Sequence, residues 1–247
     1  MSALGGLRSL AIIYGFVLHA LLLVLIVKTD FIPRLEAKFA IINSNPKIQR
    51  TIQHHVWMDD LVPDRAIIFL GDSITQGLTT ATIAPSAVNY GINSQNTVEL
   101  LQAIPLYKSL SRASLIVMTI GINDFGQGIN AGLNDRYKGI VAALPSDVPL
   151  LWNAVMPVDM GSDALAKIKD ANMTIKELCE HRQNCTYLDN WEFMTDGNGQ
   201  VKSDLFLDDK VHLDREGYRV WILALRQAIK GISRSKAEPH ISHDAPH

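Results

Sequence analysis

The chain has 247 residues, which is enough for one α/β domain with a sizeable core and an appended segment. Its 23 basic and 25 acidic residues nearly cancel, and no basic stripe interleaved with aromatic residues occurs. Nucleic-acid binding is therefore not expected, because proteins with that function carry a concentrated positive footprint.

The segment Leu10–Val27 is almost wholly apolar and is flanked by Arg8 and Lys28. A membrane-spanning helix needs about 20 such residues, whereas the apolar part of a cleavable signal has roughly 7–15. We therefore expect residues 1–30 to be an N-terminal transmembrane helix that anchors a single-pass membrane protein. A cleaved signal and a buried core helix are the alternatives.

The charges beside this segment give two opposite indications of its orientation. Lys28, Arg34 and Lys38 outnumber Arg8, which favours a cytoplasmic C-terminal domain by the positive-inside rule. Long domains are nevertheless translocated despite such charges, and a short N-terminal tail is typical of a signal-anchor. We expect the following domain to be extracytoplasmic, in the periplasm or outside the cell.

Residues 31–64 have the composition of a juxtamembrane connector. Ile48 and Ile52 recur in it at helical spacing, so we expect a helix near its middle. The adjacent pair His54 and His55 is not expected to bind a metal, because neighbouring residues on a helix do not share a face.

From residue 65 onward the pattern alternates between short apolar runs and stretches of helical periodicity. Such alternation predicts an α/β domain over residues 65–232, with a mainly parallel five-stranded sheet covered by helices on both faces. The polar tail, residues 233–247, is expected to be disordered. The expected strands are Ala66–Leu70, Ala87–Tyr90, Leu115–Ile120, Leu150–Val155 and Thr186–Leu188, and the expected helices are Thr97–Leu110, Asn134–Leu144, Asp163–His181 and Asp214–Ile232.

Cys179 and Cys185 are the only cysteines. A zinc site would need C-x-x-C spacing with further Cys or His partners, which the sequence lacks. Two unpaired thiols and a disulfide that closes a short loop both remain open, because a disulfide requires an oxidising compartment.

The first expected strand ends in Gly71, Asp72 and Ser73. Open α/β folds bind ligands at the carboxyl edge of the sheet, so this serine is placed where chemistry is expected. A serine hydroxyl needs an adjacent base to act as a nucleophile. His212 can be that base, and Asp209 can hold it in the right tautomer. The competing interpretations are that Asp72 or Ser73 caps a helix and that His212 steadies the last helix.

Two further segments follow expected strands and therefore reach the same edge. Asn123 offers a side-chain amide, and the backbone N–H groups of Ser73 and of the loop after Tyr90 offer further donors for an oxyanion. Asp124 is expected to steady the Asn123 loop by accepting backbone N–H groups. Asn123 is otherwise a common turn residue.

These segments closely resemble the motifs of the SGNH, or GDSL-like, hydrolase superfamily. Gly71–Ser73 is similar to its first block, Gly121–Asp124 to its third and Asp209–His212 to its fifth, and the resemblance covers roughly Ala66–Ile232. It implies a flavodoxin-like three-layer α/β/α fold, a Ser–His–Asp catalytic apparatus, and esterase, lipase, thioesterase or carbohydrate O-deacylase activity. The family needs no metal or organic cofactor.

One position departs from the family pattern. The second block of the family places a glycine whose backbone N–H completes the oxyanion hole, and the corresponding residue here is Ser94. The N–H survives this change, but a serine would be strained if the position demands a positive φ. Gly91 is the fallback donor. An α/β-hydrolase elbow, G-x-S-x-G, is not matched, since Thr75 replaces its second glycine.

The resemblance therefore implies a serine esterase or carbohydrate O-deacetylase with Ser73, Asp209 and His212 as its catalytic residues. The expected partners are an ester-bearing small molecule, a lipid or an acylated carbohydrate, together with the membrane. Two alternatives stay open: an acyltransferase that uses the same site, and a catalytically silent binding module that kept the fold.

Overall fold

The computed structural model describes residues 14–15, 17–20, 45–158 and 161–237. It divides the chain into two compact units, Met1–Asn43 and Ser44–His247. The predicted membrane anchor lies mostly outside the described residues. Within the part of the chain that the structure describes, no helix is long and apolar enough to cross a membrane.

The second unit contains one five-stranded parallel sheet with the strand order β2-β1-β3-β4-β5. This confirms the predicted parallel sheet, and each strand matches an expected apolar run to within two residues at its ends. The strands are β1 (Ile67–Gly71), β2 (Ala87–Gly91), β3 (Leu115–Thr119), β4 (Leu150–Asn153) and β5 (Cys185–Leu188).

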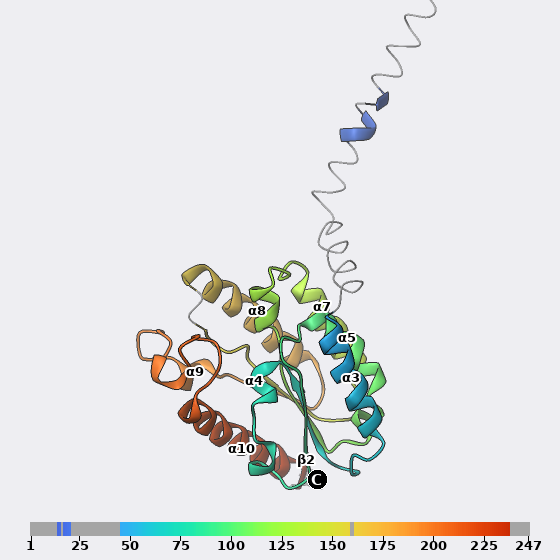
Figure 1. The fold of residues 1–247 in the computed structure, drawn as a ribbon, viewed down its shortest axis with the longest axis vertical. Helices are drawn as coiled ribbons and strands as arrows, with labels where there is room; N and C mark the ends of the chain where they lie inside the picture. The colour runs from blue at the N-terminus through green and yellow to red at the C-terminus, as the bar shows by residue number, and fades with distance from the viewer. Residues whose placement is uncertain (1–13, 16, 21–44, 159–160, 238–247) are drawn as a thin grey trace, which may run out of the picture. The chain divides into compact units, whose positions relative to one another are not determined.

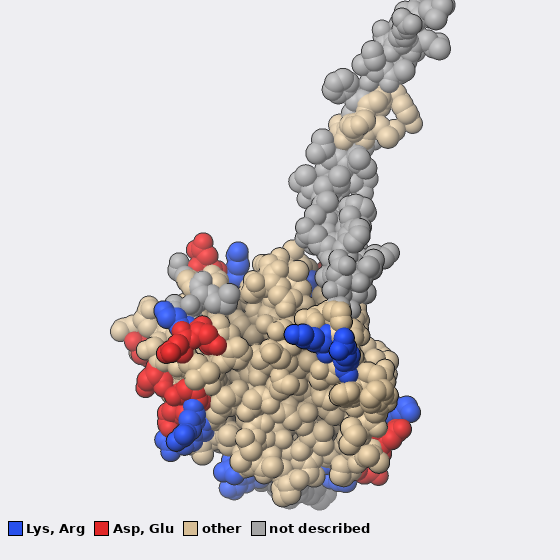
Figure 2. Space-filling model, viewed as in Figure 1, with Lys and Arg blue, Asp and Glu red and all other residues tan. Residues whose placement is uncertain are grey.

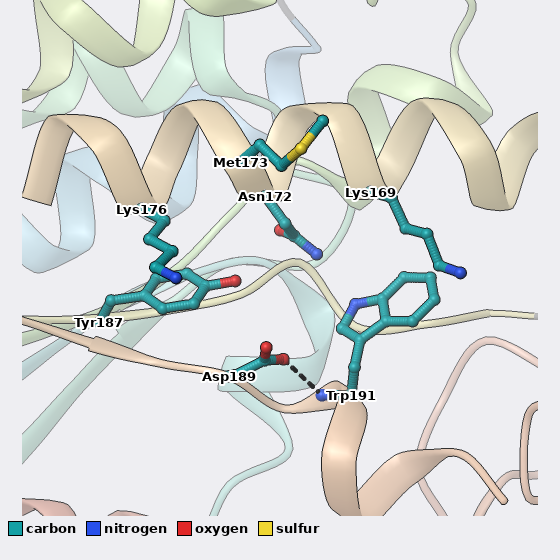
Figure 3. A pocket seen from close by; sticks show the side chains of 7 residues that line it. All are labelled: Lys169, Asn172, Met173, Lys176, Tyr187, Asp189 and Trp191. Carbon is teal, nitrogen blue, oxygen red and sulfur yellow. Dashed lines mark hydrogen bonds between the residues drawn. The ribbon is translucent and has the colours of Figure 1, made fainter. Parts of the chain in front are cut away.

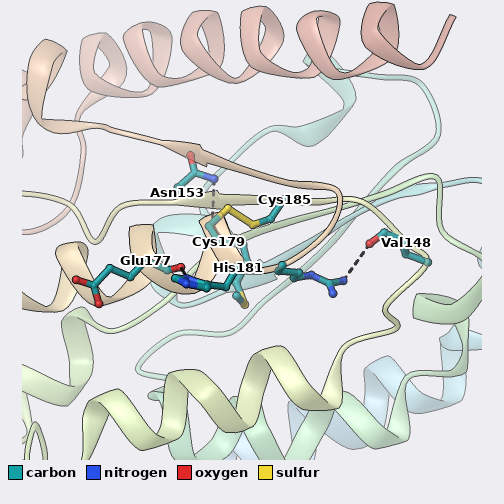
Figure 4. The surroundings of a disulfide bond; sticks show 8 residues. Val148, Asn153, Glu177, Cys179, His181 and Cys185 are labelled. Carbon is teal, nitrogen blue, oxygen red and sulfur yellow. Dashed lines mark hydrogen bonds between the residues drawn. A yellow bond between two sulfur atoms is a disulfide. The ribbon is translucent and has the colours of Figure 1, made fainter. Parts of the chain in front are cut away.

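Helices cover the sheet on both faces and give three layers. In Figure 4 α10 lies on one side of the sheet, whereas α7 and α8 lie on the other. The helix α7 also packs against α5, which stands beside α3 in Figure 1. The α-helices are α3 (Pro46–Asp59), α4 (Ser73–Gln76), α5 (Thr97–Ala103), α6 (Ile122–Gly126), α7 (Leu133–Ala143), α8 (Ser162–His181), α9 (Trp191–Met194) and α10 (Arg215–Ala237).

The central strand β3 shows why both faces must be covered. All five of its residues are buried, with Ile116 and Met118 fully inaccessible. A strand that is apolar on both faces is stable only between two helical layers, because each face removes apolar surface from water. The apolar run from Leu115 therefore fixes the middle of the sheet.

The predicted helix Thr97–Leu110 is shorter than its periodicity suggested. The helix α5 ends at Ala103, and the chain continues in two 3₁₀ turns, η2 (Ile104–Leu106) and η3 (Lys108–Arg112). Pro105 causes this break, because it has no N–H to donate within a helix and its ring clashes with the preceding turn.

Part of the segment predicted to be a connector belongs to the folded unit. The helix α3 buries Ile48 and Ile52, and the buried carboxylate of Asp59 accepts hydrogen bonds from Tyr90 Oη at 2.9 Å and Ser109 N at 2.9 Å. Such a satisfied buried carboxylate ties the helix to the sheet. Residues 31–44 of the predicted connector lie outside the described residues.

The last helix extends beyond its predicted end at Ile232, so residues 233–237 of the predicted disordered tail are helical. Residues 238–247 lie outside the described range. Asp214 caps this helix by accepting a hydrogen bond from Gly217 N at 2.8 Å. Trp221 and Leu225 lie one turn apart and are fully buried, which fixes the face that α10 turns to the sheet.

Cys179 and Cys185 form a disulfide, which decides between the two interpretations left open by the sequence (Figure 4). Cys179 lies in the last turn of α8 and Cys185 begins β5, the edge strand. The bond therefore closes the turn through which α8 joins the sheet edge.

We predict that reduction of this disulfide lowers the free energy of unfolding by about 2 kcal/mol. The intact bond restricts the unfolded chain, and breaking it makes the unfolded state more favourable. Urea titrations with and without a reductant measure the change. The double variant Cys179→Ala/Cys185→Ala serves as the control, since its unfolding must not respond to the reductant. An equal midpoint of the wild type under both conditions would contradict the prediction.

Candidate active site

The nucleophile candidate stands at a sharp turn between β1 and α4. The strand ends at Gly71, where a Cβ atom would lie 2.2 Å from Thr75 Oγ1 and 2.4 Å from the Thr119 carbonyl oxygen. Asp72 then caps α4, and its Oδ1 accepts a hydrogen bond from Ile74 N at 3.0 Å. Ser73 follows as the first residue of α4 and stays partly exposed at the carboxyl edge.

The structure brings Ser73 and His212 together across 139 residues of sequence, with 2.8 Å between Ser73 Oγ and His212 Nε2. His212 Nδ1 lies 2.7 Å from Asp209 Oδ2. An imidazole that donates from Nδ1 to a carboxylate presents an unprotonated Nε2 to the serine hydroxyl. The three side chains therefore have the geometry of a Ser–His–Asp triad.

Asp209 accepts hydrogen bonds from the backbone of its own loop as well as from the His212 side chain. Its Oδ1 accepts hydrogen bonds from the backbone N–H groups of His212 at 2.9 Å and Val211 at 3.0 Å. These bonds, followed by the bond from the imidazole, lower the pKa of Asp209 to about 2. The carboxylate is thus charged at neutral pH although it is exposed to water.

Three hydrogen-bond donors at the carboxyl ends of β1, β2 and β3 remain available. Within the described residues, the backbone N–H groups of Ser73 and Ser94 bond no protein acceptor. Asn123 Nδ2 uses one N–H on the Gln95 carbonyl oxygen at 2.9 Å and keeps the second. The N–H of Gly91, the fallback donor, is not available, because it donates to Asn89 Oδ1 at 2.9 Å.

Ser94 has a φ of 63°, so the position does demand the left-handed conformation that glycine adopts without cost. For other residues this conformation costs roughly 1–2 kcal/mol. Hydrogen bonds on both sides of Ser94 offset that cost. Gln127 Nε2 donates to the Ser94 carbonyl oxygen at 3.0 Å, and Gln76 Oε1 accepts from Asn93 N at 3.0 Å. Sequence reasoning missed both glutamines, because no motif marks them.

Asp124 lies next to Asn123 and is completely buried. It accepts hydrogen bonds from Thr97 N at 3.0 Å and Arg136 Nη2 at 3.2 Å, and so links α5, α6 and α7. Burial raises the pKa of Asp124, while Thr97 and Arg136 oppose that change. Gly121 admits Tyr137 against the same loop, since a Cβ there would lie 2.2 Å from Tyr137 Oη.

Two pockets beside the sheet differ in their relation to Ser73. The pocket in Figure 3 has a volume of about 360 Å³ and lies between α8 and β5, and Lys169 Nζ stands 5.0 Å from the centre of the Trp191 ring. Its strand β5 is separated from β1 by β3 and β4. A second pocket, of about 400 Å³, is lined by Gly77 of the turn after α4 and by α10.

Among the described residues, no group of His, Cys, Asp and Glu is arranged to hold a metal ion.

The chain belongs to the GDSL-like Lipase/Acylhydrolase family, whose model matches residues 69–220. The family resemblance drawn from the sequence motifs is therefore confirmed. No curated protein matches the chain.

Solved structures share the fold at low sequence identity. A protein from Streptococcus pneumonia is 20% identical, with a TM-score of 0.64 over 80% of this chain and 96% of that chain. A GDSL-like lipase from Bacteroides thetaiotaomicron is 18% identical, with a TM-score of 0.58 over 73% and 97%. The catalytic domain of peptidoglycan O-acetyltransferase A from Streptococcus pneumoniae is 18% identical, with a TM-score of 0.57 over 69% and 96%.

Asp72 lies in the turn that carries Ser73, and its pKa is shifted in the opposite direction to that of Asp209. It is 1% exposed, and burial raises its pKa to about 7 although the Ile74 N–H and the nearby His212 oppose that change. The folded protein therefore keeps a proton that the unfolded chain releases between about pH 4 and pH 7. The stability that Asp72 contributes is lost as the pH rises through this window.

We predict that the free energy of unfolding falls by roughly 3 kcal/mol more in the wild type than in Asp72→Asn between pH 4 and pH 7. Asparagine keeps the cap on Ile74 N but has no proton to release. Urea titrations at several pH values measure the difference. Parallel pH profiles of the two proteins would show that Asp72 does not titrate in this range.

Proposed function

We propose that the chain is a serine-dependent hydrolase of carboxylic esters. The observation that carries this proposal is the 2.8 Å contact between Ser73 Oγ and His212 Nε2, with His212 held on its other nitrogen by a charged Asp209. Family membership supports an acylhydrolase in general terms, and the site supplies the particular residues.

In the proposed reaction Ser73 Oγ attacks the ester carbonyl carbon while His212 takes the hydroxyl proton. His212 then gives this proton to the leaving alcohol, which breaks the ester bond and leaves an acyl group on Ser73. His212 then takes a proton from a water molecule, which attacks the acyl carbon. His212 returns this proton to Ser73 Oγ as the bond between Oγ and the acyl group breaks and the acid product leaves. Asp209 orients His212 and stabilises its protonated form.

Negative charge develops on the carbonyl oxygen in both steps, and the donors that remain free in the site suit it. We assign the oxyanion hole to the backbone N–H groups of Ser73 and Ser94 and to the second N–H of Asn123. Gly71, Asp72, Gly91, Gly121 and Asp124 support these groups through the close contacts and hydrogen bonds described above.

We propose hydrolysis as the reaction because family membership points to an acylhydrolase and the base is open to water. The side chain of His212 is 38% exposed, so water reaches the acyl-enzyme without a change of structure. An acyltransferase would use the same residues, and one structural neighbour is described as an O-acetyltransferase. Esters of small molecules, lipids and acylated carbohydrates, including O-acetylated ones, are the proposed substrates.

We also propose that the domain works outside the cytoplasm, held to the membrane by the apolar segment near the N-terminus. The Cys179–Cys185 disulfide supports this location, because disulfides persist in oxidising compartments.

We predict that a fluorophosphonate labels the wild type on Ser73 and that Ser73→Ala abolishes labelling. Hydrolysis of p-nitrophenyl acetate should fall by about 10⁶ in kcat, since the nucleophile is lost. The control is Ser111→Ala, which removes an exposed hydroxyl far along the sequence and should keep labelling and turnover. An unlabelled wild type would overturn the proposal and make the silent binding module the better interpretation.

We predict that Asn123→Ala lowers kcat by about 10²–10³ with little change in KM, because its amide would bond the oxyanion only in the transition state. This variant also loses the hydrogen bond to the Gln95 carbonyl oxygen. Gln127→Ala loosens the same loop without removing the proposed donor, so it should lose far less activity. Equal losses in the two variants would assign Asn123 a structural role only.

A further inference from the structure

We infer that the groove between α10 and the turn after α4 binds an anionic group, phosphate or carboxylate, on the ester substrate. This inference rests on the proposed ester hydrolysis and adds a substrate class to it. The groove is the pocket of about 400 Å³ described above, and it borders the element that carries Ser73.

Three arginines line one wall of the groove. Arg215, Arg219 and Arg226 lie on one face of α10, since their spacing of four and eleven residues returns to nearly the same direction on a helix. Guanidinium groups present several N–H donors in a plane, a geometry that matches the oxygens of carboxylates and phosphates. Thr79 and Thr82 stand on the opposite wall.

The three guanidinium groups differ in the hydrogen bonds and ion pairs that they make within the protein. Arg219 pairs with Glu216, with 2.9 Å from its Nε to Oε2, and Arg226 Nε donates to the Thr82 carbonyl oxygen at 2.8 Å. Within the described residues, no hydrogen bond or ion pair engages the exposed guanidinium of Arg215. Arg215 is therefore the residue with the most donors left for a ligand.

The groove lies beside the Ser73–His212 pair in space and in sequence. Gly77, which lines it, donates its N–H to the Ser73 carbonyl oxygen at 3.0 Å, and Tyr218 Oη donates to the Ile74 carbonyl oxygen at 2.9 Å. Arg215 follows His212 closely in the chain. A charged group in the groove would thus be close to the serine turn.

Charge is divided between the segments on the two sides of His212. The segment before it, residues 189–210, carries six carboxylates and two lysines, whereas Arg215–Ala237 carries six basic residues and one carboxylate. Figure 2 shows acidic side chains gathered on the left over the region of α9, and basic side chains along α10 below it. A negatively charged substrate would be attracted to the α10 side and repelled from the other, which sets its orientation.

The test compares esters that differ only in an anionic group. One pair is methyl tri-O-acetylglucuronide against methyl tri-O-acetylxyloside, which has the same three esters and lacks the carboxylate, and the other is dibutyryl phosphatidic acid against dibutyrylglycerol. We expect the anionic member of at least one pair to have a kcat/KM about tenfold higher at low salt, and the pair that shows it identifies carboxylate or phosphate as the ligand. The preference should shrink near 1 M salt.

Arg215→Gln should reduce the ratio of anionic to neutral kcat/KM by about tenfold through KM, because charged hydrogen bonds to the ligand are lost. Arg215→Lys should restore part of the ratio, since it keeps the charge but not the planar donors. The matched control is Arg50→Gln on α3, which lies across the sheet from α10 in Figure 1 and should leave the ratio unchanged.

Equal turnover of both members of each pair by the wild type would overturn this inference and leave the proposed ester hydrolysis standing. An equal reduction of the ratio by Arg215→Gln and Arg50→Gln would overturn it as well. Failure to hydrolyse any ester, p-nitrophenyl acetate included, would overturn the proposed function and this inference with it.

Discussion

The close approach of β2 to the backbone of α4 is the constraint on which the site depends. A Cβ atom at Gly91 would lie 2.3 Å from Gln76 N and 2.7 Å from the Thr75 carbonyl carbon, so only glycine fits. Asn89 Nδ2 reinforces this contact by donating to the Thr75 carbonyl oxygen at 2.8 Å. Because β2 ends against α4, the loop that follows carries Ser94 towards the turn that carries Ser73. The serine and the loop N–H are thus positioned by one packing contact between backbones.

Two carboxylates near the same serine and histidine have opposite pKa shifts, and each shift suits its place. Asp209 is exposed and bonded by two backbone N–H groups, which lowers its pKa to about 2 and keeps its charge beside His212. Asp72 is buried, which raises its pKa to about 7. Environments that push neighbouring carboxyl groups apart in pKa give them different roles. Here the exposed one holds His212, and the buried one builds the turn that carries Ser73.

The strands could be predicted from the sequence because each is a local apolar run. The motifs that hold Ser73, Asp209 and His212 are local as well, although the contact between Ser73 and His212 joins residues 139 apart. Apolar runs gave the strands, and the parallel sheet brings their carboxyl ends to one edge. The early end of α5 also had a local cause in Pro105, which periodicity alone overlooked. The support of Ser94 by Gln76 and Gln127 had no local pattern. These contacts join residues from separate elements, so they exist only once β1, β2 and β3 are aligned.

The two sides of the site differ in charge, which the formal net charge of −2 does not show. Composition averages an acidic segment before His212 with a basic helix after it. Two faces of the helix α10 make different contacts. Trp221 and Leu225 hold it on the sheet, and Arg215, Arg219 and Arg226 line the groove on another face. The apolar contacts that complete the third layer of the fold therefore also fix where these positive charges stand relative to Ser73.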